Sequence, residues 1–324
     1  MKITVIGAGA VGGLLAVRLA ESGHQVSVVA RGRTLAAIHA DGLTIATPIG
    51  IRSIEVAIAN DPRHFGEQDM VIVAVKTTAL QEVAPLVAPL LGEDTAVIGA
   101  MNGVPWWFFA DPALPHAGLQ LRTIDPQGLL SHALPARHMI GCVVHLTSTS
   151  PAPGVIEPGL GNRLIFGEAL GGMSKRLTHI VAAFANAGFN AAASTAIRAD
   201  IWYKLWGNMT LNPLSAMTGT TCDQLLDDPL VKTFCLRVMQ EAAAIGERIG
   251  CPQMQSGEER MQLTRQLGAF KTSMLQDAES GKPLEIDALV SVVHEIGQHL
   301  GLATPNIDSL LGMVRVFGRS RGLY

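Results

Sequence analysis

The chain has 324 residues, of which 48% are hydrophobic and 16% are charged, and its formal net charge is −3. This composition excludes an intrinsically disordered protein, and the length suits two domains better than one hydrophobic core. Because the chain is slightly acidic and has no basic stripe, we expect neither nucleic acid nor an anionic membrane surface as a partner. The composition indicates a globular protein that acts on a small molecule.

The first elements are a buried strand, a glycine-rich turn and a helix. Residues Ile3–Ile6 form an apolar run, and the loop Gly7-Ala8-Gly9-Ala10-Val11-Gly12 follows it directly. Apolar residues then recur at helical spacing as far as Leu19, and Val26–Val29 reads as the next strand. A GxGxxG pattern is weak by itself, but strand, turn, helix and strand within about thirty residues predict a dinucleotide-binding unit. Its glycines allow the backbone to approach a pyrophosphate at the helix N-terminus.

The end of the second strand indicates which dinucleotide is bound. NAD sites usually carry an acidic residue there, which holds the ribose 2′-hydroxyl. The segment Val28–Arg33 has no acid and contains Arg31 and Arg33 instead. A guanidinium group suits the 2′-phosphate of NADP, so we predict NADP(H) as the cofactor. The alternative is that both arginines are ordinary solvated surface residues.

The same N-terminal stretch superficially looks like a secretion signal. Residues Ile3–Val17 are largely apolar, but Arg18 and Glu21 interrupt the run. The cysteines form no CxxC pair and have no histidines at zinc spacing, so we predict no metal site and buried thiols in a reducing compartment. We therefore expect a cytoplasmic protein. The cysteines are Cys142, Cys222, Cys235 and Cys251.

Further strands and helices alternate along the first half of the chain. Met70–Val75 and Thr95–Met101 read as buried strands, with the helix-like stretch Leu80–Leu91 between them. This alternation predicts a parallel sheet with right-handed crossovers. Ile140–Leu146 and Arg163–Phe166 flank a stretch rich in proline and glycine, which suggests antiparallel strands added to that sheet.

Polar residues follow two of the parallel strands. Lys76 comes after the first strand and Asn102-Gly103 after the second. Because ligands of open α/β sheets gather at the carboxyl ends of the strands, we expect both to reach the crevice of the glycine loop. An amide at Asn102 could bridge cofactor and substrate. The alternatives are a solvated lysine and a plain turn.

Long helical patterns replace the strands from about residue 198. We therefore predict an α/β protein in which an N-terminal Rossmann-like, doubly wound sheet is followed by an all-α C-terminal domain. The expected division is 1–196 for cofactor binding and 197–324 for substrate binding and catalysis. The expected helices are Ala199–Met217, Pro229–Ile249, Gly257–Ser280, Pro283–Leu300 and Thr304–Phe317.

The first of these helices carries a polar face within an apolar segment. Lys204, Asn208 and Asn212 are spaced by four residues and share one side of the helix. A lysine and two amides among bulky apolar residues need polar partners or water, since burying them alone is costly. A substrate cleft would provide such partners. The alternative is a lysine that extends into solvent.

These motifs together resemble the ketopantoate reductase (2-dehydropantoate 2-reductase) family over essentially the whole chain. The resemblance implies that NADPH reduces a 2-oxo acid to a 2-hydroxy acid. Several separated motifs in one order make it specific. The motifs are the glycine loop, Lys76, Asn102-Gly103, Lys204-Leu205 with Asn208 and Asn212-Pro213-Leu214, Ser273–Asp277 and Glu285-Ile286-Asp287.

The resemblance also implies a role for each residue. Lys204 would be the general acid, because negative charge develops on the carbonyl oxygen as hydride arrives at carbon. Glu285 would orient the substrate or Lys204, although an acid just after Pro283 could simply favour a helix N-terminus. Ser273 could likewise be a capping or solvated residue. The remaining implied contacts are Asn208 and Asn212 with the substrate hydroxyl, Ser273 with its carboxylate, and Arg31 and Lys76 with the cofactor phosphates.

One segment departs from the family pattern. Trp106–Phe109 is a bulky aromatic stretch, and the longer segment Ala110–Arg137 follows it. These aromatics could reshape the pocket, cover it or build the contact of a homodimer. The substrate is therefore ketopantoate or another bulky or branched 2-oxo acid, the latter reduced with NADPH or NADH. A non-catalytic NADP-binding sensor is a remote alternative, because it would not need Lys204 and Glu285.

Overall fold

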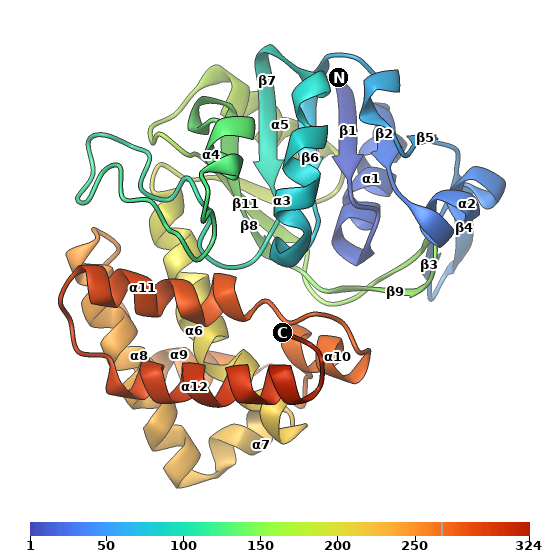
Figure 1. Cartoon of the computed structure of the whole chain (residues 1–324). Helices are drawn as coiled ribbons and strands as arrows, with labels where there is room; N and C mark the ends of the chain where they lie inside the picture. Colours follow the sequence, from blue (N-terminus) through green and yellow to red (C-terminus); the bar gives the residue numbers. More distant parts are fainter. Residues whose placement is uncertain (267) are drawn as a thin grey trace. The chain divides into compact units, whose positions relative to one another are not determined.

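The computed structural model describes residues 1–266 and 268–324 and divides into two compact units (Figure 1). The sheet unit comprises Met1–Met101 and Gly128–Ile197, and the helical unit comprises Asn102–Gln127 and Arg198–Tyr324. The chain passes from the sheet unit to the helical unit after Ile197. The segment Asn102–Gln127, which the expected division assigns to the first domain, groups with the helical unit.

The sheet unit is built around one large, mostly parallel sheet with the strand order β12-β11-β8-β7-β6-β1-β2-β5. β8 and β11 pair antiparallel, and every other neighbouring pair is parallel, which confirms the expected α/β architecture. Apolar runs form these strands because both faces of the sheet are covered. The strands are β1 (Lys2–Ile6), β2 (Gln25–Val29), β5 (Ala57–Ala59), β6 (Gln68–Val73), β7 (Leu91–Gly99), β8 (Met139–His145), β11 (Arg163–Glu168) and β12 (Asn190–Ala193).

Helices and turns connect the strands of this sheet. Pro85 and Pro89 interrupt the helix expected over Leu80–Leu91, since proline donates no backbone hydrogen bond. That stretch is a short helix, α3 (Leu80–Val83), followed by two 3-10 turns. The other elements are α1 (Ala10–Glu21), α2 (Gly32–Asp41), η1 (Pro62–His64), η2 (Thr77–Ala79), η3 (Ala84–Leu86), η4 (Ala88–Leu90), α4 (Leu129–Ala133), η5 (Ala136–His138) and α5 (Lys175–Asn186).

A second, four-stranded sheet with the order β4-β3-β10-β9 was not predicted from the sequence. It packs on α1, where a Cβ atom at Gly13 would lie 2.4 Å from Ile156 Cδ1. Glycine at this position lets the helix and the strand approach closely. The strands are β3 (Leu43–Thr47), β4 (Gly50–Ile54), β9 (Ser148–Ala152) and β10 (Val155–Pro158).

The helical unit is organised around the long helix α6 (Ile197–Thr218), which begins at the last residue of the sheet unit (Figure 1). None of the helices among the described residues has the length and hydrophobicity that a membrane-spanning segment requires. The helices that follow are α7 (Cys222–Asp227), α8 (Pro229–Arg248), α9 (Gly257–Arg265), α10 (Ser273–Glu279), η6 (Asp287–Ser291), α11 (Val292–His299) and α12 (Pro305–Ser320).

Two of the expected helices are wrong in extent. The helix expected over 257–280 is two helices, each with its own N-cap: Ser256 accepts from the amide of Glu259, and Thr272 from that of Leu275. Leu267, which that single helix would include, lies outside the described residues. The helix expected from Pro283 begins later, as the π turn η6, because the amide of Leu284 donates to the carbonyl of Leu323 at 2.9 Å.

Segment 102–127 belongs to the helical unit because its aromatic residues pack on Arg198 at the start of α6. The Arg198 guanidinium carbon lies 4.6 Å from the ring centroid of Phe108 and 5.3 Å from that of Phe109. Arg198 also donates to the carbonyl of Ile249 at 3.1 Å, and its burial lowers the pKa of the guanidinium. Trp106–Phe109 are each at most 5% exposed. They are therefore interior residues and do not form the exposed surface that a homodimer contact through them would need.

Candidate functional site

The glycine loop forms a tight turn between β1 and α1. Gly7 has φ +97°, and a Cβ atom on Gly12 would lie 2.0 Å from the Gly7 carbonyl oxygen. A Cβ atom on Gly9, by contrast, would have no neighbour within 4 Å. Gly9 is also the N-cap of α1 and carries no side-chain cap. The loop thus presents backbone amides and the positive end of a helix dipole to open space, which fits a dinucleotide pyrophosphate.

Lys76 lies at the same edge of the large sheet as this loop. β6 pairs with β1 in parallel, with Val73 opposite Ile6, so the residues after both strands leave the sheet at the same end. Lys76 is the half-buried N-cap of η2. The structure therefore places Lys76 and the glycine loop on neighbouring strands at the carboxyl edge of the sheet, where α/β sheets bind their ligands.

Arg31 is the N-cap of α2, directly after β2. Its guanidinium forms an ion pair with Glu82 of α3. Both side chains are at least half exposed, and exposed ion pairs contribute little to stability. Arg31 can therefore leave Glu82 and bind another anion, with which the Glu82 carboxylate competes for the guanidinium group. No local sequence pattern indicates this partner, which is 51 residues away.

In the helical unit, Lys204 of α6 meets Asn102. Lys204 Nζ donates to Asn102 Oδ1 at 2.7 Å. Lys204 and Asn208 are half-buried, and Asn212 is 5% exposed. The polar face expected on this helix thus includes a lysine whose ammonium group is held by an amide from segment 102–127. Its two asparagines continue that face along the helix.

Ser273 and Glu285 lie on other elements of the helical unit. Ser273 is the exposed first residue of α10, and Thr272 rather than Ser273 caps this helix. Glu285 is half-buried between two buried neighbours and precedes the π turn η6. The amide of Leu289 donates to its carbonyl at 3.2 Å, so Glu285 stands at the start of this helical segment, where the helix dipole also favours an acid.

Two features of the helical unit were missed by the sequence analysis. The Arg260 guanidinium carbon lies 5.1 Å from the ring centroid of Tyr203, and a Cβ atom on Gly207 would lie 2.8 Å from Arg260 Nη2. Arg260 therefore rests on α6 within one turn of Lys204, and it forms no ion pair with the described carboxylates. The only sequence signal was a glycine in the middle of this helix. The second missed feature is the π turn η6.

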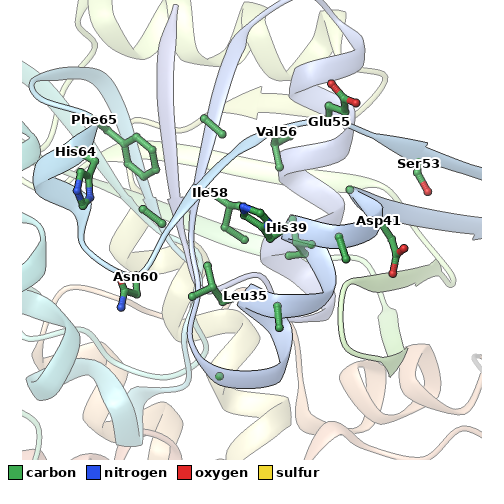
Figure 2. Close-up of a pocket in the computed structure, with 17 residues that line it drawn as sticks. Leu35, His39, Asp41, Ser53, Glu55, Val56, Ile58, Asn60, His64 and Phe65 are labelled. Atoms are coloured by element: carbon green, nitrogen blue, oxygen red, sulfur yellow. The ribbon is translucent and has the colours of Figure 1, made fainter.

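A groove of about 1300 Å³ opens elsewhere in the sheet unit, between α2 and β5 (Figure 2). Figure 2 shows His39 and Ile58 side by side near the centre of the view, with Glu55 and His64 farther out. None of the residues predicted for the site lines this groove. We therefore describe two separate sets of candidate residues, the glycine loop with Lys76 and Arg31 in the sheet unit and the polar face of α6 in the helical unit.

Two family models match the chain and together cover most of it. Residues 3–171 match the model described as ketopantoate reductase PanE/ApbA, and residues 196–317 match its C-terminal counterpart. The chain belongs to the ketopantoate reductase family. It is an oxidoreductase of this pyridine-nucleotide-dependent family.

Individual relatives agree with the family models. The chain is 40% identical to a 2-dehydropantoate 2-reductase from Mesorhizobium japonicum over 325 residues, covering 100% of both chains. A crystal structure of a candidate ketopantoate reductase from Ralstonia solanacearum is 56% identical, with a TM-score of 0.96, and covers 100% of this chain and 99% of the other. D-mandelate dehydrogenase, solved with NADH and anilino(oxo)acetate, has the same fold at 19% identity, with a TM-score of 0.85 and coverage of 99% and 100%.

Proposed function

We propose that this protein reduces a 2-oxo acid to a 2-hydroxy acid with NADPH, that its substrate is 2-dehydropantoate, and that Lys204 is the general acid. The observation that carries the proposal is the half-buried Lys204 ammonium held 2.7 Å from Asn102 Oδ1. The full-length similarity to a 2-dehydropantoate 2-reductase supports the substrate. A sensor without catalysis would not need a proton donor held in this way.

Lys204 supplies the proton that carbonyl reduction requires. Negative charge grows on the carbonyl oxygen as the carbon is reduced, and a cationic donor at that oxygen stabilises the charge and then transfers its proton. The hydrogen bond to Asn102 uses one of the three ammonium hydrogens and fixes the direction of the others. Lys204 is therefore oriented before the substrate binds.

The other polar residues of the helical unit bind and orient the acid. Asn208 and Asn212 offer amides for its hydroxyl group, and Ser273 offers a hydroxyl for its carboxylate. Glu285 orients the substrate or Lys204. Arg260 adds a guanidinium group over Tyr203, next to Lys204 in sequence, and it forms no ion pair with a carboxylate of the described residues, so it suits the negative charge of a 2-oxo acid.

Apart from Asn102, which belongs to the helical unit, the proposed cofactor residues lie in the sheet unit. Gly7–Gly12 and the amides of the α1 N-terminus would hold the pyrophosphate, since the position above Gly9 is open. Lys76 would contact a phosphate, Asn102 would bridge cofactor and substrate, and Arg31 would bind the 2′-phosphate. NADPH supplies the hydride when it is bound. The buried, free thiols of the four cysteines suit the reducing cytoplasm.

The cofactor assignment makes opposite predictions for Arg31 and its partner. Arg31→Ala should raise the Kd for NADPH about tenfold and leave that for NADH unchanged, because one charge-assisted contact is worth roughly 1.4 kcal/mol. Glu82→Gln should tighten NADPH binding, since it removes the competing carboxylate. Fluorescence titration with both nucleotides measures each constant. Equal effects of Arg31→Ala on NADPH and NADH would disprove the 2′-phosphate assignment.

The substrate assignment is tested with a panel of 2-oxo acids. We expect kcat/KM for 2-dehydropantoate to exceed that for branched and aromatic 2-oxo acids by at least about tenfold, which corresponds to one missing polar contact or methylene group. The decrease in NADPH absorbance reports each rate. A tenfold preference for an aromatic or simple branched acid would replace 2-dehydropantoate with that acid and leave the reaction class unchanged.

A further inference from the structure

The backbone that carries Asn102 is locked to one carbonyl group of the helical unit. The amide of Val104 donates to the Ala288 carbonyl at 3.1 Å. Gly103 has φ +85°, and a Cβ atom there would lie 2.3 Å from the same oxygen and 2.7 Å from Ala288 Cβ. Only glycine fits this contact, for reasons of both space and conformation. The backbone position of Asn102 is therefore fixed by the contact that the next residue, Gly103, makes with Ala288.

The π turn makes this carbonyl available. In a regular α-helix the Ala288 carbonyl would accept from the amide of Val292, four residues later. Within η6, that amide donates to the carbonyl of Asp287 instead. The wider turn thus leaves the Ala288 carbonyl oxygen without this helical hydrogen bond. The amide of Val104 donates to that oxygen instead.

The same turn also begins two residues after Glu285. The amide of Leu289 donates to the Glu285 carbonyl at 3.2 Å, and the hydroxyl of Tyr324 donates to Asp287 Oδ1 at 2.8 Å. The hydrogen bond from the Leu284 amide to the Leu323 carbonyl adds to these contacts. Together they hold the N-terminal side of the turn. One local structure therefore fixes the backbone at both Glu285 and Asn102.

We propose that η6 positions Lys204: through the contact between Gly103 and the Ala288 carbonyl, it holds Asn102 Oδ1 where it accepts from Lys204 Nζ. Gly103 and Ala288 are positioning residues, and neither touches the substrate. This inference rests on the proposed role of Lys204. The proposal predicts that a substitution at Gly103 lowers kcat only because it displaces Asn102.

A double-mutant cycle tests this dependence. Gly103→Ala and Asn102→Ala should each lower kcat about ten- to a hundredfold, and the double variant should be within about threefold of the slower single variant, because both remove the same contact. Two effects that multiply would overturn the proposal. If Gly103→Ala does not fold, Ala288→Val replaces it in the cycle, since it crowds the same contact from the opposite side.

Gly301→Ala is the matched control. Gly301 is an exposed glycine of the same unit with φ +66°, and a Cβ atom there would have no neighbour within 4 Å. This variant carries the same kind of backbone strain without touching η6, so its kcat should equal that of the wild type. A comparable fall in its kcat would mean that strain alone explains the effect, against the proposal.

Crystal structures of the variants keep this proposal separate from the proposed function. In Gly103→Ala, or in Ala288→Val, the distance from Lys204 Nζ to Asn102 Oδ1 should exceed 3.5 Å, beyond the usual range of a hydrogen bond. A distance that stays at 2.7 Å contradicts the positioning role, whatever the enzyme reduces. If the wild type turns over no 2-oxo acid but the distance lengthens, the proposed function fails and the positioning of Lys204 stands.

Discussion

Replacing Lys204 by alanine is expected to lower kcat for the 2-oxo acid by about 10²- to 10⁴-fold, the range that a positioned proton donor contributes. On the role proposed for Lys204, the variant would lose both the proton donor and the cation beside the carbonyl oxygen. Because the proposed cofactor contacts do not include Lys204, the Kd for NADPH should change little. Stopped-flow measurement of NADPH oxidation and fluorescence titration separate the two effects.

Lys232→Ala is the control for this experiment. Lys232 is an exposed lysine of α8 in the same unit, and its removal should leave kcat unchanged. Lys204→Arg keeps the charge but holds its proton more tightly and has a different shape, so it should remain slow. If Lys204→Ala keeps kcat within about threefold of wild type, below the smallest effect expected of a general acid, another group is the acid.

The second large effect is expected for Gly12→Ala. The added Cβ atom would lie 2.0 Å from the Gly7 oxygen and 2.8 Å from Ala74 Cβ, so the turn between β1 and α1 has to open. We expect a loss of about 1–3 kcal/mol in the free energy of unfolding, as for other overpacked positions, together with the loss of measurable NADPH binding. Thermal unfolding and fluorescence titration give both quantities.

Gly9→Ala separates packing from cofactor binding in the same loop. Its Cβ atom would enter open space, so the free energy of unfolding should fall by less than about 1 kcal/mol, the usual cost of alanine at an N-cap. If the pyrophosphate occupies that space, NADPH binding should still weaken about tenfold or more, from the loss of roughly one good contact. A Gly9→Ala variant that binds NADPH normally would show that the cofactor does not approach Gly9.

Local signals were sufficient for much of the fold. The strands that end at Ile6, Val29 and Val73 are buried apolar runs, and such runs in a parallel sheet can be recognised without any partner. The glycine loop has a fixed spacing, and Lys204, Asn208 and Asn212 follow the helical period. Each of these features depends on residues that are close in sequence.

Contacts between distant residues were not predictable in this way. The strand β4 (Gly50–Ile54) is largely exposed. Its sequence does not show the continuous apolar run that is typical of the strands of the larger sheet. Asn102–Gln127 joins the helical unit through Arg198 and through Glu295, whose carboxylate accepts from the amides of Arg122 and Thr123. The ion pair of Arg31 with Glu82 likewise depends on where the short helix α3 places Glu82. No local pattern encodes these partners.

The path of the chain between the two units limits how this enzyme can be divided or recombined. It crosses from one unit to the other after Met101, after Gln127 and after Ile197, so the helical unit consists of two separate pieces of sequence. A chimera joined only at residue 197 would take the aromatic partners of Arg198 from one parent and the arginine from the other. We therefore expect that an exchange of the whole helical unit between family members requires residues 102–127 and 198–324 to be transplanted together.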